Sequence, residues 1–284
     1  METKIIDGIN YQLNEITFTA IVIHNEGYSG DIVIPETIIS EKVSYKVTTI
    51  DSSAFEGCES LASLNIPNSV TTIGRFAFKD CKSITSINIP NGVKWIGEAT
   101  FKGCKSLASI NIPDSVTSIG RDAFSFCHSL TSINIPDGVT NIEEYVFGGC
   151  RSLTSITIPD SVTRIGRNAF SFCHSLTSIN IPNSVTKIGA AAFASCKSLT
   201  SINIPNGVPY IGESTFNGCK SHTSIIIPSS VTTIGTWAFN GCESLADIRY
   251  NGTIEQWQKI KLANDWYKDI PSTIVHCNDG DVEI

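Results

Sequence analysis

The sequence lacks an apolar run that could cross a bilayer, and it lacks an excess of basic residues. Its longest apolar stretches, such as Ile16–Ile23, are far shorter than the roughly 20 residues that a membrane helix needs. Its 20 basic and 27 acidic residues give a net charge of −7, whereas binding to nucleic-acid phosphates requires basic charge. These absences argue against membrane insertion and against nucleic-acid binding.

Motifs for catalysis and for phosphate binding are also absent. The sequence has no Gly-x-Ser-x-Gly element, no phosphate-binding loop and no dinucleotide fingerprint. Of its five histidines, His128 and His174 share a repeat column two rungs apart, about 10 Å at the usual strand spacing, which is too far to share a metal ion. We therefore expect no catalytic residue, no metal and no cofactor, and we predict that the chain is not an enzyme.

Ten cysteines are present, and nine of them are spaced by a constant 23 residues. A disulfide network does not have one constant spacing, whereas one cysteine per repeat indicates a structural column. Free cysteine behaves as a small buried apolar side chain. Cys277 lies outside the series, and we expect it to be buried in a C-terminal cap. The regular positions are Cys58, Cys81, Cys104, Cys127, Cys150, Cys173, Cys196, Cys219 and Cys242.

The segment 183–205, NSVTKIGAAAFASCKSLTSINIP, shows the repeat. Its apolar Ile202 and Ile204 alternate with polar residues, which predicts a half-buried strand. Pro205 lacks an N–H group and ends that strand. Val185 and Ile188 indicate a second short strand. The Ala-Ala-Phe-Ala-Ser-Cys stretch predicts a helical turn. One such unit cannot bury its apolar side chains alone, so the repeats must stack.

The residues thus predict an α/β repeat solenoid of 23-residue rungs with distinct ends. We expect an N-terminal β cap over residues 1–29, a solenoid of about ten rungs over 30–250, and a C-terminal cap over 251–284. Thr253-Ile-Glu-Gln256 is a capping box that predicts a short helix through about Leu262. A closing strand is expected over 272–277.

The repeat columns resemble the BspA-like, or Treponema pallidum-type, leucine-rich repeat surface proteins. The resemblance covers roughly residues 30–250 and is carried by Val185-Thr-Lys-Ile-Gly189, Ala192-Phe193, Cys196, Leu199, Ile202, Ile204 and Pro205. It implies a right-handed leucine-rich-repeat superhelix with a concave parallel β-sheet, and short strands and helical turns on the convex side. It also implies a bacterial surface protein that binds host matrix or other surface proteins. The family has no catalytic residues to carry over.

The column directly after the cysteine is the most distinctive candidate for ligand binding. It carries five fixed positive charges and two histidines, with Glu59 and Glu243 at its ends. Two interpretations stay open: an anion-binding edge, or a solvated loop column copied by duplication. The basic column consists of Lys82, Lys105, His128, Arg151, His174, Lys197 and Lys220.

Small polar residues at the outward strand positions form a second candidate surface, since solenoids commonly bind partners across their stacked strands. Its representatives are Ser132, Asn134, Ser178 and Asn180.

One histidine departs from the repeat pattern, because His222 stands where the other repeats have leucine or isoleucine. We interpret His222 as a tolerated defect in the core or at its edge.

Three hypotheses for function follow. The first is a monomeric, non-catalytic adhesion module at the cell surface or secreted, whose partner is a host extracellular-matrix or bacterial surface protein. The second is an acidic-glycan-binding module. The third is an intracellular interaction scaffold, because the first residues, METKIIDGIN, contain no secretory signal and a cytoplasmic location stays open.

Overall fold

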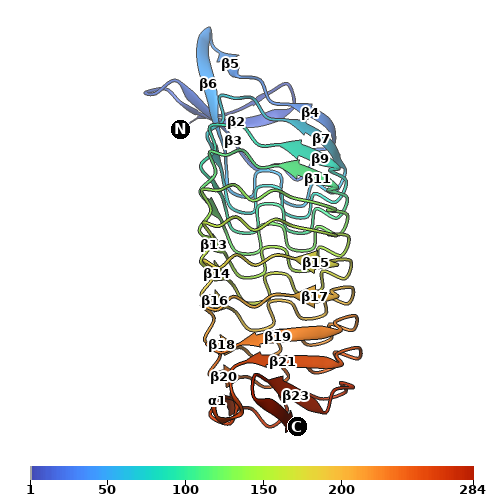
Figure 1. Ribbon diagram of the computed structural model, residues 1–284. Helices are drawn as coiled ribbons and strands as arrows, with labels where there is room; N and C mark the ends of the chain where they lie inside the picture. Colours follow the sequence, from blue (N-terminus) through green and yellow to red (C-terminus); the bar gives the residue numbers. More distant parts are fainter. Residues whose placement is uncertain (1) are drawn as a thin grey trace. The chain divides into compact units, whose positions relative to one another are not determined.

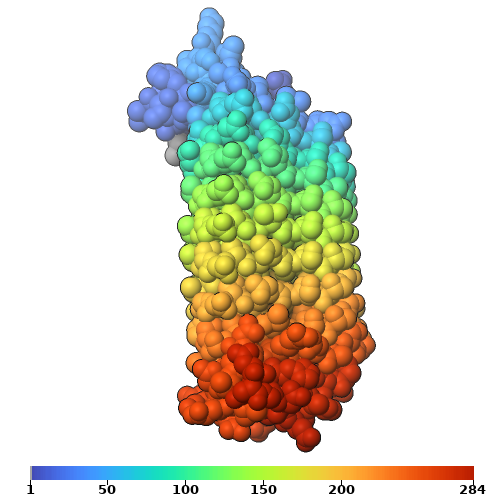
Figure 2. Space-filling view, in the orientation of Figure 1, coloured from blue at the N-terminus to red at the C-terminus, as the bar shows by residue number. Residues whose placement is uncertain are grey.

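The computed structural model describes residues 2–284 and contains two compact units, one ending at Val139 and the other beginning at Thr140. Each unit is a stack of rungs in which equivalent residues of successive repeats pair in parallel (Figure 1). The side chains of successive rungs form layers in the space-filling view (Figure 2). The predicted repeat solenoid is therefore confirmed for each unit.

The first unit begins with an irregular sheet. Strands β1 (Glu2–Ile6), β2 (Ile9–Asn14) and β3 (Thr19–Val22) pair antiparallel. Strand β3 then pairs in parallel with β6 (Val43–Ile50), which forms an antiparallel hairpin with β5 (Thr37–Ser40). The strand at Gly30–Val33, β4, pairs in parallel with β7 (Leu61–Asn65).

The remaining strands of the first unit belong to two parallel ladders (Figure 1). In one ladder Ser86, Ile87 and Asn88 lie opposite Ser109, Ile110 and Asn111. The second ladder contains the predicted second short strand of each repeat. The ladders consist of β9 (Ser86–Asn88) with β11 (Ser109–Asn111), and of β8 (Thr72–Ile73) with β6 and β10 (Trp95–Ile96) with β12 (Ser118–Ile119).

The second unit repeats both ladders. One parallel ladder contains β15 (Ser178–Ile179), β17 (Ser201–Ile202), β19 (Ser224–Pro228), β21 (Asp247–Asn251) and β23 (Ile274–Cys277). Strand β24 (Gly280–Glu283) pairs antiparallel with β23 at its edge. The other ladder contains β13 (Asn141–Ile142), β14 (Arg164–Ile165), β16 (Lys187–Ile188), β18 (Tyr210–Ile211), β20 (Thr233–Ile234) and β22 (Lys261–Leu262).

The helical turns expected between the ladders are not confirmed. The segment around Phe193 is a series of hydrogen-bonded turns, in which Ala191 and Ser195 have φ values of 54° and 59°. Alternate N–H groups donate to the next rung, as Phe193 does to Thr215 O at 3.0 Å, while the others donate three residues back. Two left-handed residues per repeat interrupt any helix, and they turn the segment into a third ladder between rungs.

Stacked phenylalanines occupy the centre of each unit. In the second unit Phe170 is fully buried, and its ring centroid lies 5.4 Å from that of Phe147 and 5.5 Å from that of Phe193. In the first unit the rings of Phe78 and Phe101 stack at 5.3 Å. Each repeat therefore contributes one large side chain to a continuous apolar column within its unit.

A short helix and two tryptophans cover the last rung. The capping box at Thr253 and Gln256 is present, but α1 spans only Ile254–Trp257, because Leu262 belongs to β22 and continues the ladder of β20. Within residues 2–284, α1 is the only helix. Trp266 is buried and meets the last phenylalanine, Phe239, edge to face at 6.0 Å.

Glycine is required at Gly189 by the close approach of the preceding rung. A Cβ atom there would lie 2.5 Å from the backbone nitrogen of Arg167, whereas at Gly207 it would meet Thr186 Cγ2 at 3.4 Å, an ordinary contact. We expect Gly189→Ala to lower the free energy of unfolding by about 1–3 kcal/mol, since backbone must shift. Gly207→Ala should leave it unchanged or slightly higher. Urea denaturation measures both, and equal effects would contradict the close-approach explanation.

Candidate ligand-binding surface

The outward strand positions form an exposed, uncharged face in each unit. Ser178 and Asn180 are exposed in the second unit, where Ser178 lies opposite Ser201. Ser132 and Asn134 are exposed in the first unit, although they lie outside the named strands. The structure thus presents these four predicted residues to solvent, but none of them is an aromatic or arginine anchor of the kind that dominates protein interfaces.

In the first unit the basic column contains one lysine that forms an ion pair and one that forms none among the described residues. Lys82 Nζ lies 2.5 Å from Glu59 Oε1. Lys105 is exposed and forms no ion pair with any residue from 2 to 284. The His128 ring meets the Phe126 ring edge to face, with centroids 6.2 Å apart. The acidic end of the column therefore neutralises the lysine beside it.

The second unit shows the same arrangement in reverse order. Lys220 Nζ lies 2.6 Å from Glu243 Oε1, whereas Arg151 and Lys197 are exposed and have no ion-pair partner in the described chain. Burial lowers the pKa of His174, and the positive charges of Lys197 and Arg151 lower that pKa further. Within this unit, the part of the basic column that has no acidic partner thus lies around His174.

Exposed phenylalanines beside both histidines were missed by the sequence reasoning. Phe126 and Phe172 directly precede the cysteine of their repeats, have φ values of 59° and are 43% and 50% exposed. The signal that could have found them is the glycine at this position in other repeats, as at Gly149 and Gly218, which indicates a left-handed backbone. Such a backbone favours glycine over residues with a side chain.

The cysteine column is structural, as predicted. The Cys196 thiol is buried and donates a hydrogen bond to the Phe170 carbonyl at 3.2 Å, and equivalent bonds recur in both units. Burial raises the pKa of these thiols, to about 12 at Cys104, so the nucleophilic thiolate is disfavoured. The expectation for Cys277 was wrong, because it is half-buried in the edge hairpin β23–β24.

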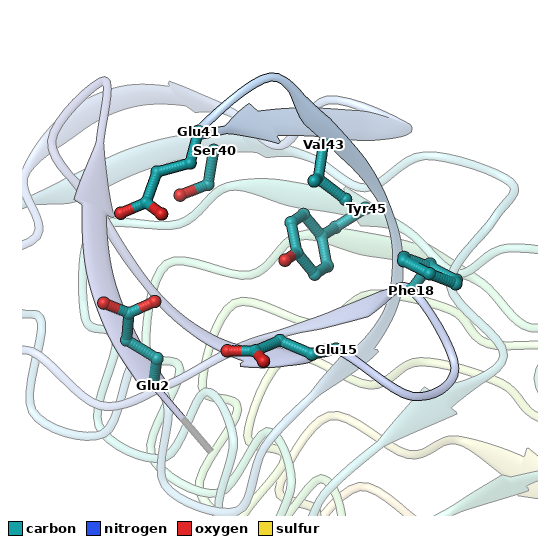
Figure 3. A pocket seen from close by; sticks show the side chains of 7 residues that line it. All are labelled: Glu2, Glu15, Phe18, Ser40, Glu41, Val43 and Tyr45. Atoms are coloured by element: carbon teal, nitrogen blue, oxygen red, sulfur yellow. The ribbon is translucent and has the colours of Figure 1, made fainter.

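The N-terminal sheet of the first unit surrounds a cavity of about 360 Å³. Figure 3 shows the carboxylates of Glu2, Glu15 and Glu41 around this cavity, with Tyr45 on its wall. Lys4 Nζ lies 2.7 Å from Glu2 and 3.1 Å from Glu41, so it partly neutralises the cluster. Within residues 2–284 no group of three histidine, cysteine or acidic side chains is arranged to hold a metal ion.

A second cavity, of about 400 Å³, lies at the C-terminal strands of the second unit. Its charged lining residues already have partners. Arg249 Nε lies 2.9 Å from Asp247, and His276 Nδ1 lies 2.8 Å from Asp281.

No helix among residues 2–284 is long and apolar enough to cross a membrane.

The parallel ladders, stacked phenylalanines and exposed columns define a leucine-rich-repeat solenoid. The family model for the "BspA type Leucine rich repeat region (6 copies)" matches residues 35–153 and 140–265. The chain belongs to this family of BspA-type leucine-rich repeat proteins, as its repeat columns indicate. A search of curated protein sequences found no match.

Solved structures of bacterial leucine-rich repeat proteins are similar to this chain. The Treponema pallidum leucine-rich repeat protein is 30% identical, with a TM-score of 0.60, over 67% of this chain and 87% of its own. A leucine-rich repeat protein from Bacteroides ovatus is 26% identical, with a TM-score of 0.56, over 88% of this chain and 84% of its own. The pneumococcal vaccine antigen PcpA, at 16% identity and a TM-score of 0.56 over 96% and 88% of the two chains, shows likeness of fold alone.

Proposed function

We propose that this protein is a non-catalytic adhesion module, at the cell surface or secreted, which binds host extracellular-matrix or bacterial surface proteins. Leucine-rich repeat proteins generally bind protein partners, and the BspA-type family is commonly surface-associated. The observation that carries the proposal is the exposed basic column, whose Lys105, Arg151 and Lys197 have no ion-pair partner within residues 2–284. Unpaired surface charges of one sign favour an oppositely charged partner surface.

The test is binding of the full chain to a panel of immobilised matrix proteins. We expect the wild type to bind at least one of them. Replacing the five basic side chains of the column by glutamine should weaken that binding by about tenfold or more, because charge complementarity is lost. The replaced residues are Lys82, Lys105, Arg151, Lys197 and Lys220.

A matched control removes the same number of charges elsewhere. It replaces Lys46, Lys94, Arg164, Lys187 and Lys261 by glutamine, and these residues lie outside the column. The control should bind as the wild type does. Binding to no member of the panel, or equal loss in both variants, would overturn the proposed role of the column in adhesion.

Binding of an acidic glycan is the second candidate function. It is favoured by the same uncompensated charges at Lys105, Arg151 and Lys197, and by the neighbouring hydroxyl-rich face. A glycan bound mainly through charge should dissociate steeply as salt is added, because the Debye length falls from about 10 Å at 0.1 M to about 3 Å at 1 M. Salt-insensitive binding would exclude this mode.

A further inference from the structure

Phe172, in the second unit, is an exposed apolar side chain on a strained backbone. Its φ of 59° lies in the left-handed region, and the same column of this unit has Gly149, Ser195, Gly218 and Gly241. A bulky side chain costs free energy there, because its Cβ approaches the backbone. The residue is 50% exposed to solvent. The left-handed backbone at this position does not require a phenylalanine, since Ser195, one rung along, has the same φ of 59°.

Basic residues lie on the rung of Phe172 and on the two adjacent rungs. The Phe172 and His174 rings meet edge to face, at 77° and a centroid distance of 6.2 Å. The residues that follow His174 and Lys197 donate backbone hydrogen bonds to the carbonyls of Arg151, at 3.1 Å, and His174, at 3.2 Å. Arg151, His174 and Lys197 therefore lie on adjacent, hydrogen-bonded rungs, with the exposed ring next to the middle one.

The charge of this cluster is available to a partner. Lys220, one rung beyond Lys197, is held by Glu243 at 2.6 Å. Arg151 and Lys197 have no such acidic partner anywhere in residues 2–284. The uncompensated positive charge and the exposed aromatic ring thus coincide on the same rungs.

The first unit contains the same combination. Phe126 has the same φ of 59° and is 43% exposed. Its ring meets that of His128 edge to face at 6.2 Å, and Lys105, one rung earlier, is exposed without an ion pair in the described chain. Both copies have the sequence Ser-Phe-Cys-His. The strained aromatic therefore accompanies a histidine and an uncompensated cation in each unit.

We propose that Phe172, His174, Arg151 and Lys197 form a binding site for an acidic peptide segment that carries an aromatic or large aliphatic side chain next to its carboxylates. Phe126, His128 and Lys105 form a second site of the same chemistry in the first unit. The proposal rests on the proposed function as a protein-binding module, and it names the partner's chemistry. Aromatic residues and arginine are the side chains most enriched at the energetic centres of protein interfaces.

Two observations favour a peptide over a polyanionic glycan. A polyanion would use every cation of the column, whereas Lys82 and Lys220 are occupied by Glu59 and Glu243. The remaining cations lie on rungs adjacent to those of the exposed rings, an arrangement that matches an apolar side chain flanked by carboxylates. A short peptide segment presents both groups within a few residues, because successive side chains lie about 3.4 Å apart along an extended chain.

The experiment measures binding of the full chain to three immobilised polymers: a random copolymer of glutamate and tyrosine, polyglutamate, and hyaluronan. We expect the copolymer to bind most tightly. Phe172→Gly should weaken copolymer binding about tenfold, the loss of one interface anchor. The same substitution should raise the thermal midpoint by about 2–4 °C, since it relieves backbone strain. Opposite signs for binding and stability distinguish a binding role from a structural one.

Charge variants complete the test. The double variant Arg151→Gln/Lys197→Gln should weaken copolymer binding at least as much as Phe172→Gly, and Lys220→Gln, its matched control, should have little effect. Unchanged copolymer binding by Phe172→Gly overturns the proposal, and so does tighter binding of hyaluronan. If Phe172→Gly leaves binding to matrix proteins and copolymer intact, the site is wrong and the adhesion proposal stands. If the wild type binds neither polymer nor matrix protein, both fail.

Discussion

Phe170→Ala is expected to lower the free energy of unfolding of the second unit by about 3–5 kcal/mol, the range for removing a buried phenylalanine. Phe170 is fully buried and stacks on Phe147 and Phe193 at 5.4 and 5.5 Å. Its removal leaves a cavity that touches both neighbouring rungs. Because each rung depends on its neighbours, the loss should spread along the stack. Urea denaturation, together with hydrogen exchange of the adjoining rungs, measures the effect.

The matched control lies two residues along the chain. Phe172 is the same residue type but is 50% exposed, so Phe172→Ala should change the free energy of unfolding by no more than about 0.5 kcal/mol. Similar losses in the two variants would contradict the assignment of Phe170 to the core column and Phe172 to the surface. A loss below about 1 kcal/mol for Phe170→Ala would show that the stack tolerates a gap.

His222→Leu is expected to stabilise the protein, and to do so more strongly in acid. His222 is fully buried, its ring lies 6.2 Å from that of Phe216, and neither ring nitrogen has a hydrogen-bond partner of good geometry within residues 2–284. An unsatisfied buried polar group costs about 1–3 kcal/mol. Leucine, which other repeats have at this position, as at Leu199 and Leu245, removes that cost at neutral pH.

The pH dependence follows from the direction of the pKa shift. Burial lowers the pKa of His222 from 6.5 in the unfolded chain to about 4 in the folded protein. The unfolded chain therefore binds a proton first, so stability is complete above pH 6.5 and falls as the pH is lowered toward 4. The loss approaches about 3 kcal/mol, at about 1.36 kcal/mol per pKa unit. His222→Leu should abolish this part of the acid sensitivity.

His222→Gln separates the two effects. Glutamine keeps polar atoms in the core but does not titrate, so it should remove the acid sensitivity without the gain at neutral pH. Free energies of unfolding measured in urea at pH 7 and pH 4.5 give both quantities. If the wild type and His222→Leu lose the same free energy between these pH values, His222 does not cause the acid sensitivity.

Alternation of apolar and polar residues predicted the ladder that contains Ile202, and the apolar residues Val185 and Ile188 indicated the second ladder. Ile202 and Ile204 face inward and Ser201 faces outward because side chains alternate across any strand. The constant spacing of the cysteines likewise predicted a buried column. These features depend on local pattern and on strict repetition, and both can be read from one repeat.

The turn segment shows where local pattern was insufficient. The Ala-rich stretch around Phe193 has high helix propensity, yet Ala191 and Ser195 have left-handed backbones. Their N–H groups bond to carbonyls of the next rung, 22 residues away in sequence at Ala191–Glu213 and Ser195–Asn217. Hydrogen bonding between rungs outweighs local propensity, which is weak in comparison. The same competition ends α1 at Trp257 and gives Leu262 to β22.

The candidate surface, too, could be predicted from the sequence only in part. The basic column could be predicted from its spacing, because a residue's position in a repeat determines whether it faces solvent. The sequence did not show which of these charges form ion pairs. Lys82 and Lys220 lie beside acidic residues one repeat away, whereas Arg151 and Lys197 do not. Repetition in the sequence determines the rungs, the core and the exposed columns. Contacts between rungs decide the backbone of the turns, the ion pairs, the burial of His222 and the exposure of Phe172, since each depends on side chains that only stacking brings together.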